Sequence, residues 1–379
     1  LTLIIDSAKV LVLLTAAAAL AYTLRGRPAR IRAVVWGTAL AGALLIPAVA
    51  PLLPAFSLPL PVALAEVGAA IDPQPQPAVH ITSLSISPGK IAVANDTLGT
   101  TMTSRLADVS WRQWLLTGWL VGVAVALGRF GNGLWRMSRA VSRARPVTEP
   151  RRLAALAGAR HRVGCRREVR LLVTDEIDIP ATVGVVRPVV VVPRQAATWT
   201  DERWDAVLLH EAIHVVRLDW PVRMVARIAR AVYWFNPLAW WAVSRLDLEQ
   251  ELACDEEVLA LGSRASHYAC HLLGIARGAV RTPALAVSGL EMARRSQLEE
   301  RIMTMLKRPH HRKAKLMVLL PAAVLVGAMV PALAAVHPGD SPPRQASPEL
   351  EQIITEMEVV EARLEPHLEE IEAAIEGEL

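Results

Sequence analysis

The sequence predicts a mainly helical α+β membrane protein with four membrane-spanning helices, one folded domain inside the cell and a short acidic helix outside. Hydrophobic residues make up 53% of the 379-residue chain and charged residues only 20%, a balance typical of membrane proteins. Apolar runs long enough to cross a bilayer occur in four places. β-Branched runs, which are typical of strands, gather in one segment between the third and fourth of them.

Each predicted span is a run close to the roughly 20 mostly apolar residues that a helix needs to cross the hydrocarbon core. The four runs are Leu1–Leu24, Ala33–Phe56, Trp111–Gly128 and Leu316–Val336. The fourth also resembles a signal peptide, because a basic start and an apolar middle lead to Ala332-Leu333-Ala334, a possible cleavage site. Its internal position favours a membrane anchor.

Basic residues between the apolar runs predict the orientation. The joint Arg25–Arg32 contains four arginines, whereas the Pro/Ser/Thr-rich loop 57–110 has a slight acidic excess. Because Lys and Arg are retained on the cytoplasmic side, we expect the joint inside and the loop outside. Basic residues also flank residues 129–315 at both ends, which places that segment in the cytoplasm.

The predicted organisation is that of a multi-pass protein of the bacterial inner (cell) membrane. In chain order it comprises spans 1 and 2 (1–56), an external loop (57–110), span 3 (111–128), a cytoplasmic domain (129–315), span 4 (316–336) and an external acidic tail (337–379). The net charge of +5 does not indicate direct nucleic-acid binding, because the arginines lie beside apolar runs rather than on a separate basic face. The three cysteines form no CxxC pair, and we expect reduced thiols.

The cytoplasmic segment begins with helical sequence and then changes period. The runs "REVRLLVTD" and "ATVGVVRPVVVVPRQ", interrupted by Gly184 and Pro188, predict short strands joined by tight turns. The next segment predicts a helix with Thr200 as its N-cap, Arg203 at its third helical position and acidic residues in its first turn.

Two histidines and a glutamate lie on this helix, in "WDAVLLHEAIHVVRLDW". His210 and His214 are four residues apart and hence on one helical face, with Glu211 beside them. Imidazole nitrogens are zinc ligands, and a carboxylate next to a catalytic zinc can take a proton from water. The HExxH spacing therefore predicts one Zn²⁺, with Glu211 as the general base. A chance match involving ordinary core histidines is the alternative.

A third ligand is offered by "LDLEQELACDEEVL". Glu251 and Asp255 are also four apart, so that Glu251 can complete the zinc site while Asp255 accepts a hydrogen bond from a ligand imidazole. A solvated acidic face is the alternative, because Glu249, Glu256 and Glu257 crowd the same stretch. With both halves present, a zinc peptidase site is the favoured interpretation.

The motifs "ATVGVVRPVVVVP", "LLHEAIHVVRLDW", "YWFNPLAWW" and "ELACDEEVL" together resemble those of the BlaR/MecR family of membrane-embedded metallopeptidases, metallopeptidase family fifty-six. The resemblance covers about Glu168–Leu306. It implies a gluzincin-like zinc peptidase domain that faces the cytoplasm between spans three and four. It also implies that the protein cleaves itself or a DNA-binding repressor, as signalling members do. By motif position it assigns His210, His214 and Glu251 as ligands, Glu211 as base, Asp255 as a support to a ligand, and Arg217 and Asp219 as structural.

The chain departs from the antibiotic-sensing members of that family. In those proteins a penicillin-binding domain follows span four, whereas only His337–Leu379 follows it here. We therefore do not expect beta-lactam sensing by that route. The tail places apolar residues near heptad positions and contains eleven glutamates against one arginine from Pro348 onward. A short acidic coiled coil with a pairing role is expected, and a solvated tail is the alternative.

The expected function is a signal-responsive membrane zinc endopeptidase. Its expected partners are a protein or peptide substrate and the lipid bilayer, and homodimerisation is left open. The substrate is expected to add as a strand to a sheet edge at Val189–Pro193. One alternative is a non-enzymatic transducer with a structural metal. Another is a quality-control or prenyl-protein peptidase, which shares HExxH and ExxxD but usually has more spans.

Two further segments have open interpretations. Residues 220–243 combine arginines on one helical face with an aromatic cluster, which favours an interfacial helix pair with a turn at Asn236-Pro237 over a buried hairpin. The run "HYACH" could bind a second metal through His267, Cys270 and His271, but an ordinary packing helix is favoured.

Overall fold

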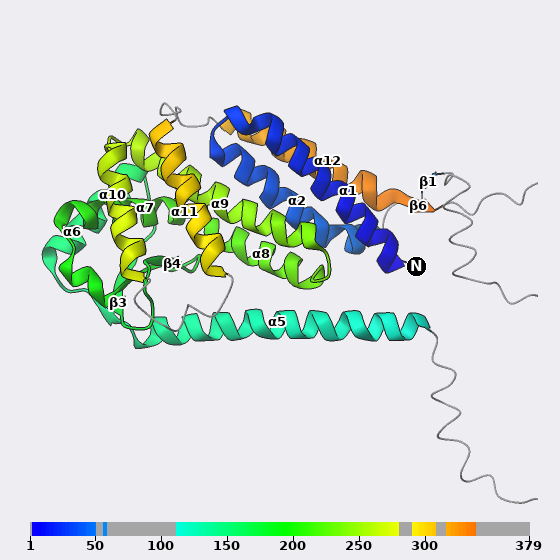
Figure 1. Ribbon diagram of the computed structural model, residues 1–379, viewed down its shortest axis with the longest axis horizontal. Coiled ribbons are helices and arrows are strands. Elements are labelled where there is room, and N and C mark those ends of the chain that lie inside the picture. The colour runs from blue at the N-terminus through cyan, green and yellow to red at the C-terminus, as the bar shows by residue number, and fades with distance from the viewer. Residues whose placement is uncertain (1, 51–55, 59–110, 280–289, 308–315, 339–379) are drawn as a thin grey trace, which may run out of the picture. The chain divides into compact units, whose positions relative to one another are not determined.

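The computed structural model of the chain describes residues 2–50, 56–58, 111–279, 290–307 and 316–338, which are drawn as ribbons in Figure 1. They belong to two units, one formed by residues 1–53 and 92–334 and the other by residues 54–91 and 335–379. In the second unit, strands β1 (Phe56–Leu58) and β6 (Val336–Pro338) pair in parallel. Most of the predicted external loop and acidic tail lies outside the described residues.

Three apolar helices pack around one core. They are α1 (Thr2–Thr23), α2 (Ala29–Val49) and α12 (Leu316–Ala335), and the short helix η1 (Leu24–Gly26) joins the first two. Val330 of α12 approaches α2 at Gly42, where a side chain would leave no room for it. Helices α1 and α2 are long and apolar enough to cross a membrane, and the described side chains of α12 form a shorter apolar segment, Ala323–Ala335.

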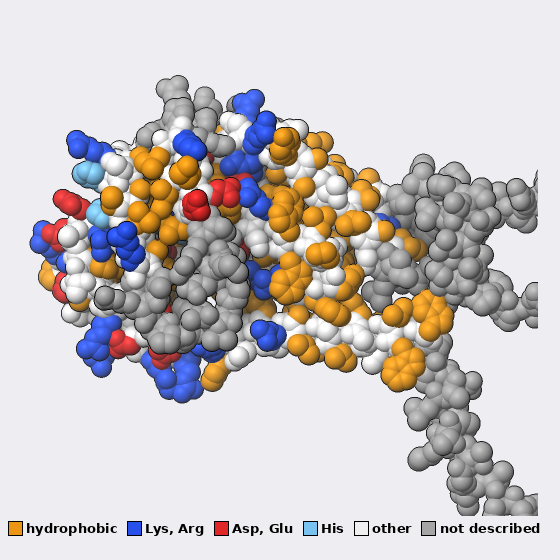
Figure 2. Space-filling view, viewed as in Figure 1, with side chains coloured by type: hydrophobic (Ala, Val, Ile, Leu, Met, Phe, Trp, Pro, Cys, Tyr) orange, Lys and Arg blue, Asp and Glu red, His pale blue; other side chains and the backbone are white. Residues whose placement is uncertain are grey.

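Helix α5 (Trp111–Arg143) contains the predicted third span but does not end at Gly128. Its 33 residues extend about 50 Å at about 1.5 Å per residue, against about 30 Å for the hydrocarbon core. The helix therefore continues from the apolar segment into the domain that follows. Hydrophobic side chains cover much of α5 in the space-filling view, whereas charged side chains gather over the domain (Figure 2).

The predicted joint Arg25–Arg32 is shorter in the structure, because α2 begins at Ala29 rather than Ala33. Arg32 is inside the helix and only 5% exposed. Its guanidinium bonds Glu249 through Nε (2.8 Å) and Nη2 (2.7 Å), and its Nη1 donates to the main-chain oxygen of Arg27 (2.6 Å). The buried carboxylate of Glu249 offsets part of the cost of burying the Arg32 charge, and hydropathy alone cannot reveal this pairing.

Helices α8 (Asp219–Val232) and α9 (Pro237–Ala260) form the predicted pair with a turn at Asn236-Pro237. Asn236 Oδ1 accepts a hydrogen bond from the main-chain nitrogen of Leu238 and thereby caps α9. Both helices pack against α2, and α8 also packs against α5. The pair therefore runs lengthwise along apolar helices (Figure 1).

Aromatic side chains fix the turn of this pair between α2 and α5. Tyr233 donates to the main-chain oxygen of Ala43 in α2 (2.9 Å). The Trp119 indole of α5 donates to the main-chain oxygen of Val232 (3.1 Å), and Trp234 packs on Gly122 of α5. Other aromatic side chains of the pair remain partly exposed, namely Phe235, Trp240 and Trp241. The hairpin thus packs against α2 and α5 but keeps several aromatic side chains partly exposed, so that neither of the two sequence-based alternatives describes it fully.

The domain contains a four-stranded sheet in the order β2-β3-β5-β4. Its strands are β2 (Arg145–Pro146), β3 (Arg170–Thr174), β4 (Ala181–Val183) and β5 (Val189–Pro193). β5 pairs in parallel with β3 and antiparallel with β4, so that it has a neighbour on each side. The prediction that Val189–Pro193 forms a sheet edge is therefore wrong, and β2 and β4 are the edge strands of the described sheet.

The remaining helices of the domain pack around the sheet and one another. They are α6 (Pro150–Val163), α7 (Asp201–Arg217), α10 (Ala265–Ala279) and α11 (Leu290–Lys307). α7 occupies the centre of this core, where Leu208, Leu209 and Ile213 are buried. The "HYACH" residues lie on α10, and within the described parts of the chain they belong to no group that could hold a metal. All three cysteines are unpaired, as expected.

Candidate metal centre

Helix α7 carries His210, Glu211 and His214, and its sequence explains where it begins. Thr200 is its N-cap, as predicted, and the Thr200 hydroxyl accepts a hydrogen bond from the main-chain nitrogen of Arg203. Acidic residues occupy the first turn, where they favour the positive end of the helix dipole. Because both faces of the following turns are buried, the two histidines are held inside the domain rather than on its surface.

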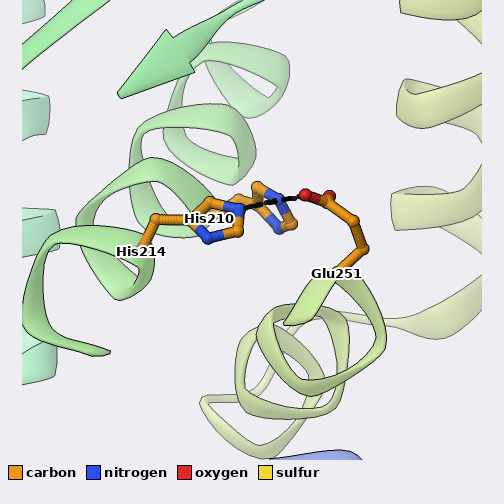
Figure 3. A group of neighbouring side chains, drawn as sticks. All are labelled: His210, His214 and Glu251. Carbon is orange, nitrogen blue, oxygen red and sulfur yellow. Dashed lines mark hydrogen bonds and ion pairs between the residues drawn. The ribbon is translucent and has the colours of Figure 1, made fainter. Parts of the chain in front are cut away.

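The three predicted ligands lie together, two on α7 and one on α9 (Figure 3). His210 Nε2 is 3.1 Å from His214 Nε2 and 3.4 Å from Glu251 Oε2. Glu251 Oε1 lies 3.5 Å from His214 Nε2. A tetrahedral zinc ion with bonds of about 2.0–2.1 Å requires ligand atoms about 3.3 Å apart. The spacing of these donors therefore fits one zinc ion.

Hydrogen bonds at Nδ1 orient the imidazoles of His210 and His214. His214 Nδ1 lies 2.8 Å from Asp219 Oδ2, and His210 Nδ1 lies 2.8 Å from the Tyr268 hydroxyl. With Nδ1–H donating in each ring, Nε2 keeps its lone pair for a metal. Asp219 reaches back to α7 because Leu218 adopts a left-handed conformation, with φ of 59°, and turns the chain sharply into α8.

The predicted contact from Asp255 to a ligand imidazole is mainly indirect. Asp255 Oδ1 is 3.4 Å from His210 Nδ1, but it accepts a shorter hydrogen bond, 2.8 Å, from Tyr268. Tyr268 therefore lies between Asp255 and His210. Tyr268 could not be predicted as part of the site, since nothing in "HYACH" shows that α10 packs against α7. Asp219 was expected to be structural. Its carboxylate contacts Nδ1 of His214 and therefore also orients that imidazole.

Two arginines hold the carboxylate of Glu251. Arg223 Nη2 is 2.6 Å from Oε1, and Arg301 Nη1 is 3.1 Å from Oε2. Arg301 also bonds both oxygens of Asp255, at 2.7 and 2.9 Å. Burial alone would raise the pKa of Glu251, but the charge of Arg301 and the contacts with both histidines hold that pKa well below its usual value. Glu251 is therefore ionised, as a metal ligand must be.

Burial and nearby charges also have opposite effects on the pKa values of Asp219 and His210. Burial raises the pKa of Asp219, but the hydrogen bond with His214 and the charge of Arg217 outweigh it and bring the pKa to about 2. Burial lowers the pKa of His210, and the hydrogen bond and negative charge of Glu251 more than reverse this effect.

A second group, formed by His214, Asp219 and Cys254, also lies close enough to hold a metal. Cys254 Sγ is 3.3 Å from His214 Nδ1. However, burial raises the pKa of Cys254 well above its usual value, and Asp219 and Glu251 raise it further. Because zinc binds the thiolate and not the thiol, this group is the poorer zinc site.

Comparison with known proteins identifies the family. A profile of the BlaR1 peptidase M56 family matches residues 9–305. The regulatory protein BlaR1 of Bacillus licheniformis is 28% identical over 149 residues, which is 39% of this chain and 25% of that protein. The methicillin resistance mecR1 protein of Staphylococcus aureus is 26% identical over 103 residues, which is 27% of this chain and 18% of that protein. The aligned part of this chain thus spans a quarter or less of either relative. Since the family profile covers most of the sequence, including α7 and α9, the chain belongs to the BlaR1 peptidase M56 family.

Proposed function

We propose that this protein is a membrane-embedded zinc endopeptidase that cleaves a protein in response to a signal. The observation that carries the proposal is the convergence of His210, His214 and Glu251, with donor atoms 3.1–3.5 Å apart. Membership of a peptidase family supports the reaction class. The regulatory role is supported by the relatives, one of which is called a regulatory protein and the other a methicillin resistance protein.

In the proposed mechanism each residue near the site has one task. Zinc bound by the three ligands would activate a water molecule and polarise the scissile carbonyl. Glu211, adjacent to a ligand on α7, takes the proton of that water and passes it to the leaving amine. Asp219 and Tyr268 hold the imidazoles with Nε2 toward the metal, and Arg223 and Arg301 keep Glu251 ionised and fixed. No covalent intermediate is required.

The substrate is proposed to be an extended segment of protein that joins the sheet at β4. This strand has a partner on only one side within the described sheet, and its Thr182 contacts Glu211. A peptide added along the open edge would gain main-chain hydrogen bonds and pass beside the base. The proposed substrates are the chain itself or a DNA-binding repressor, and a homodimer would allow one copy to cleave another.

Comparing the parent protein with Glu211→Gln tests the proposed activity. The amide cannot take the proton, so cleavage should fall by at least about a hundredfold, the lower range of general-base effects. Zinc content should stay near one ion per chain, because no ligand is changed. Cleaved proteins would be identified by mass spectrometry of N-termini in cells that produce each form.

Glu202→Gln is the matched control, because it makes the same exchange on an exposed residue of α7. It should cleave like the parent protein. Equal cleavage by the parent and Glu211→Gln would contradict the peptidase mechanism. If cleavage stopped in Glu211→Gln but signalling persisted, the protein would instead act as a transducer without enzymatic output.

We also propose a four-span topology with the domain that carries the metal centre in the cytoplasm. Helices α1, α2 and α5 are apolar and long enough to span, and α12 follows with an apolar segment. A green fluorescent protein fused after Lys307 should fluoresce, and alkaline phosphatase fused after Val336 should be active, because these fusions would lie on opposite sides of the membrane. A stably expressed Lys307 fusion without fluorescence, or a stably expressed Val336 fusion without phosphatase activity, would contradict this topology.

A further inference from the structure

The carboxylate of Glu211 is bonded from the sheet rather than from its own helix. Thr182 Oγ1, on β4, lies 2.6 Å from Glu211 Oε2 and 3.3 Å from the main-chain oxygen of Glu211. A hydroxyl has one proton to donate. The shorter contact, to a charged acceptor, is the stronger one and receives that proton.

Among the described residues, Thr182 is the side chain that bonds Glu211. Glu211 is only 6% exposed, so that few water molecules can take over this task. A glutamate has rotatable bonds between its main chain and its carboxylate, and burial alone does not select their angles. The hydroxyl of Thr182 therefore fixes the orientation of the carboxylate group.

The position of Thr182 is itself well determined. Within the sheet it pairs with Val190 of β5, which is fully buried. The threonine hydroxyl thus extends from a strand that is held on one side by the core. Bonding of Oε2 leaves Oε1 free to take a proton, which is the division of tasks that an efficient general base needs.

We propose that Thr182 is a positioning residue, which orients Glu211 as the general base of the peptidase reaction. This inference rests on the proposed function. It goes beyond the motif, because Thr182 lies 29 residues before Glu211 in the chain and its hydroxyl bonds the carboxylate of Glu211.

The test uses three variants and a ligand whose binding requires a proton acceptor. The hydroxamate of N-acetyl-leucine binds zinc through two oxygens and loses a proton on binding, which Glu211 is placed to receive. Thr182→Val keeps the size of the side chain but removes the donor, Thr182→Ser keeps the donor, and Thr198→Val is the control at an exposed hydroxyl bonded to Gln195. Zinc content and thermal unfolding of each full-length variant in detergent show whether the site and the fold are retained.

The expected result is a loss of hydroxamate affinity of about tenfold in Thr182→Val, the size of one hydrogen bond to a charged group. Thr182→Ser and Thr198→Val should bind like the parent protein. In the Glu211→Gln background, Thr182→Val should cause no further loss, because Thr182 acts through Glu211. In cleavage assays that use the substrates identified with the parent protein, Thr182→Val should lower kcat and leave KM nearly unchanged.

Two results would overturn the inference. One is unchanged hydroxamate affinity in Thr182→Val with normal zinc content. The other is an equal loss in the parent and Glu211→Gln backgrounds, which would indicate a structural effect independent of Glu211. A parent protein that binds neither zinc nor hydroxamate would contradict the proposed function, and the inference would fall with it.

Discussion

Replacing Glu251 with glutamine is expected to lower zinc content from about one ion per chain to near zero and to abolish cleavage. The amide keeps the size of the side chain but loses the negative charge that pairs with the cation. Substitution of a residue that only hydrogen-bonds to a metal ligand typically weakens metal binding about 10–100-fold. Loss of a direct ligand should weaken it further. Mass spectrometry of the purified protein for metals, before and after dialysis against a weak chelator, measures the effect.

Glu257→Gln provides the control for this variant, since it makes the same exchange on α9 at a residue outside the metal-binding groups. It should retain its zinc. The loss of charge at Glu251 also leaves Arg223 and Arg301 without their shared partner. Thermal unfolding must therefore be recorded alongside, and a folded Glu251→Gln protein with full zinc content would exclude Glu251 as a ligand.

The largest effect on stability is expected from Arg32→Met. Arg32 and Glu249 form a buried pair with side-chain exposures of 6% and 2%. Removal of one partner leaves an uncompensated buried charge, and such changes destabilise by about 3–5 kcal/mol. Glu249 keeps a contact with Arg245 at 3.2 Å, so we expect a loss near the lower end, about 3 kcal/mol. The unfolding free energy in detergent or lipid nanodiscs is the quantity to measure.

Two companion variants separate charge from packing. Arg27→Met, at an exposed position of the same joint, should change stability by less than about 0.5 kcal/mol. The double variant Arg32→Met/Glu249→Leu should regain most of the loss, because apolar residues can replace a buried ion pair. If Arg32→Met were as stable as Arg27→Met, the ion pair between α2 and α9 would contribute nothing to the fold.

The link between α2 and α9 also connects the apolar helices to the candidate metal centre. Glu249 lies two residues before Glu251 on α9, and Glu256 of the same helix accepts a hydrogen bond from the main-chain nitrogen of Ala29 at the start of α2 (3.0 Å). The N-terminal part of α9 packs on α2 within the apolar core. One helix thus contacts the apolar helices and carries a predicted ligand.

The part of the site that depends on helical spacing could be predicted from the sequence. Residues four apart lie on one face of any helix, so His210 and His214 had to be neighbours once α7 formed. Thr200 marked the start of that helix. Glu251 was predicted from its own spacing to Asp255 and from the family resemblance. No spacing rule could show that α9 faces α7, and only the fold supplies that information.

The contacts between distant segments could not be predicted. Tyr268 and Thr182 reach the site from α10 and β4, and neither residue stands in a spacing that indicates a role. Arg32 was expected in a joint because hydropathy treats arginine as polar, whereas its partner Glu249 is 217 residues away in the chain. The position of such a residue depends on a partner far away in the chain, and the local sequence does not show which residue that partner is.

The wrong prediction for Val189–Pro193 has a physical explanation that the sequence did contain. A strand with one face in water alternates apolar and polar residues, whereas "VVVV" is apolar at every position. Such a run is typical of a strand buried on both faces, and all five residues of β5 are buried. The shorter run Ala181–Val183, with Thr182 at its centre, has the composition of an edge strand.

X-ray absorption at the zinc edge of the purified protein tests the central claim most directly. If His210, His214 and Glu251 bind the metal, the spectrum should contain only nitrogen and oxygen neighbours at about 2.0–2.2 Å, with the outer-ring signature of two imidazoles. A sulfur neighbour at about 2.3 Å would instead indicate the group that contains Cys254. That result, or protein purified without any zinc, would contradict the account.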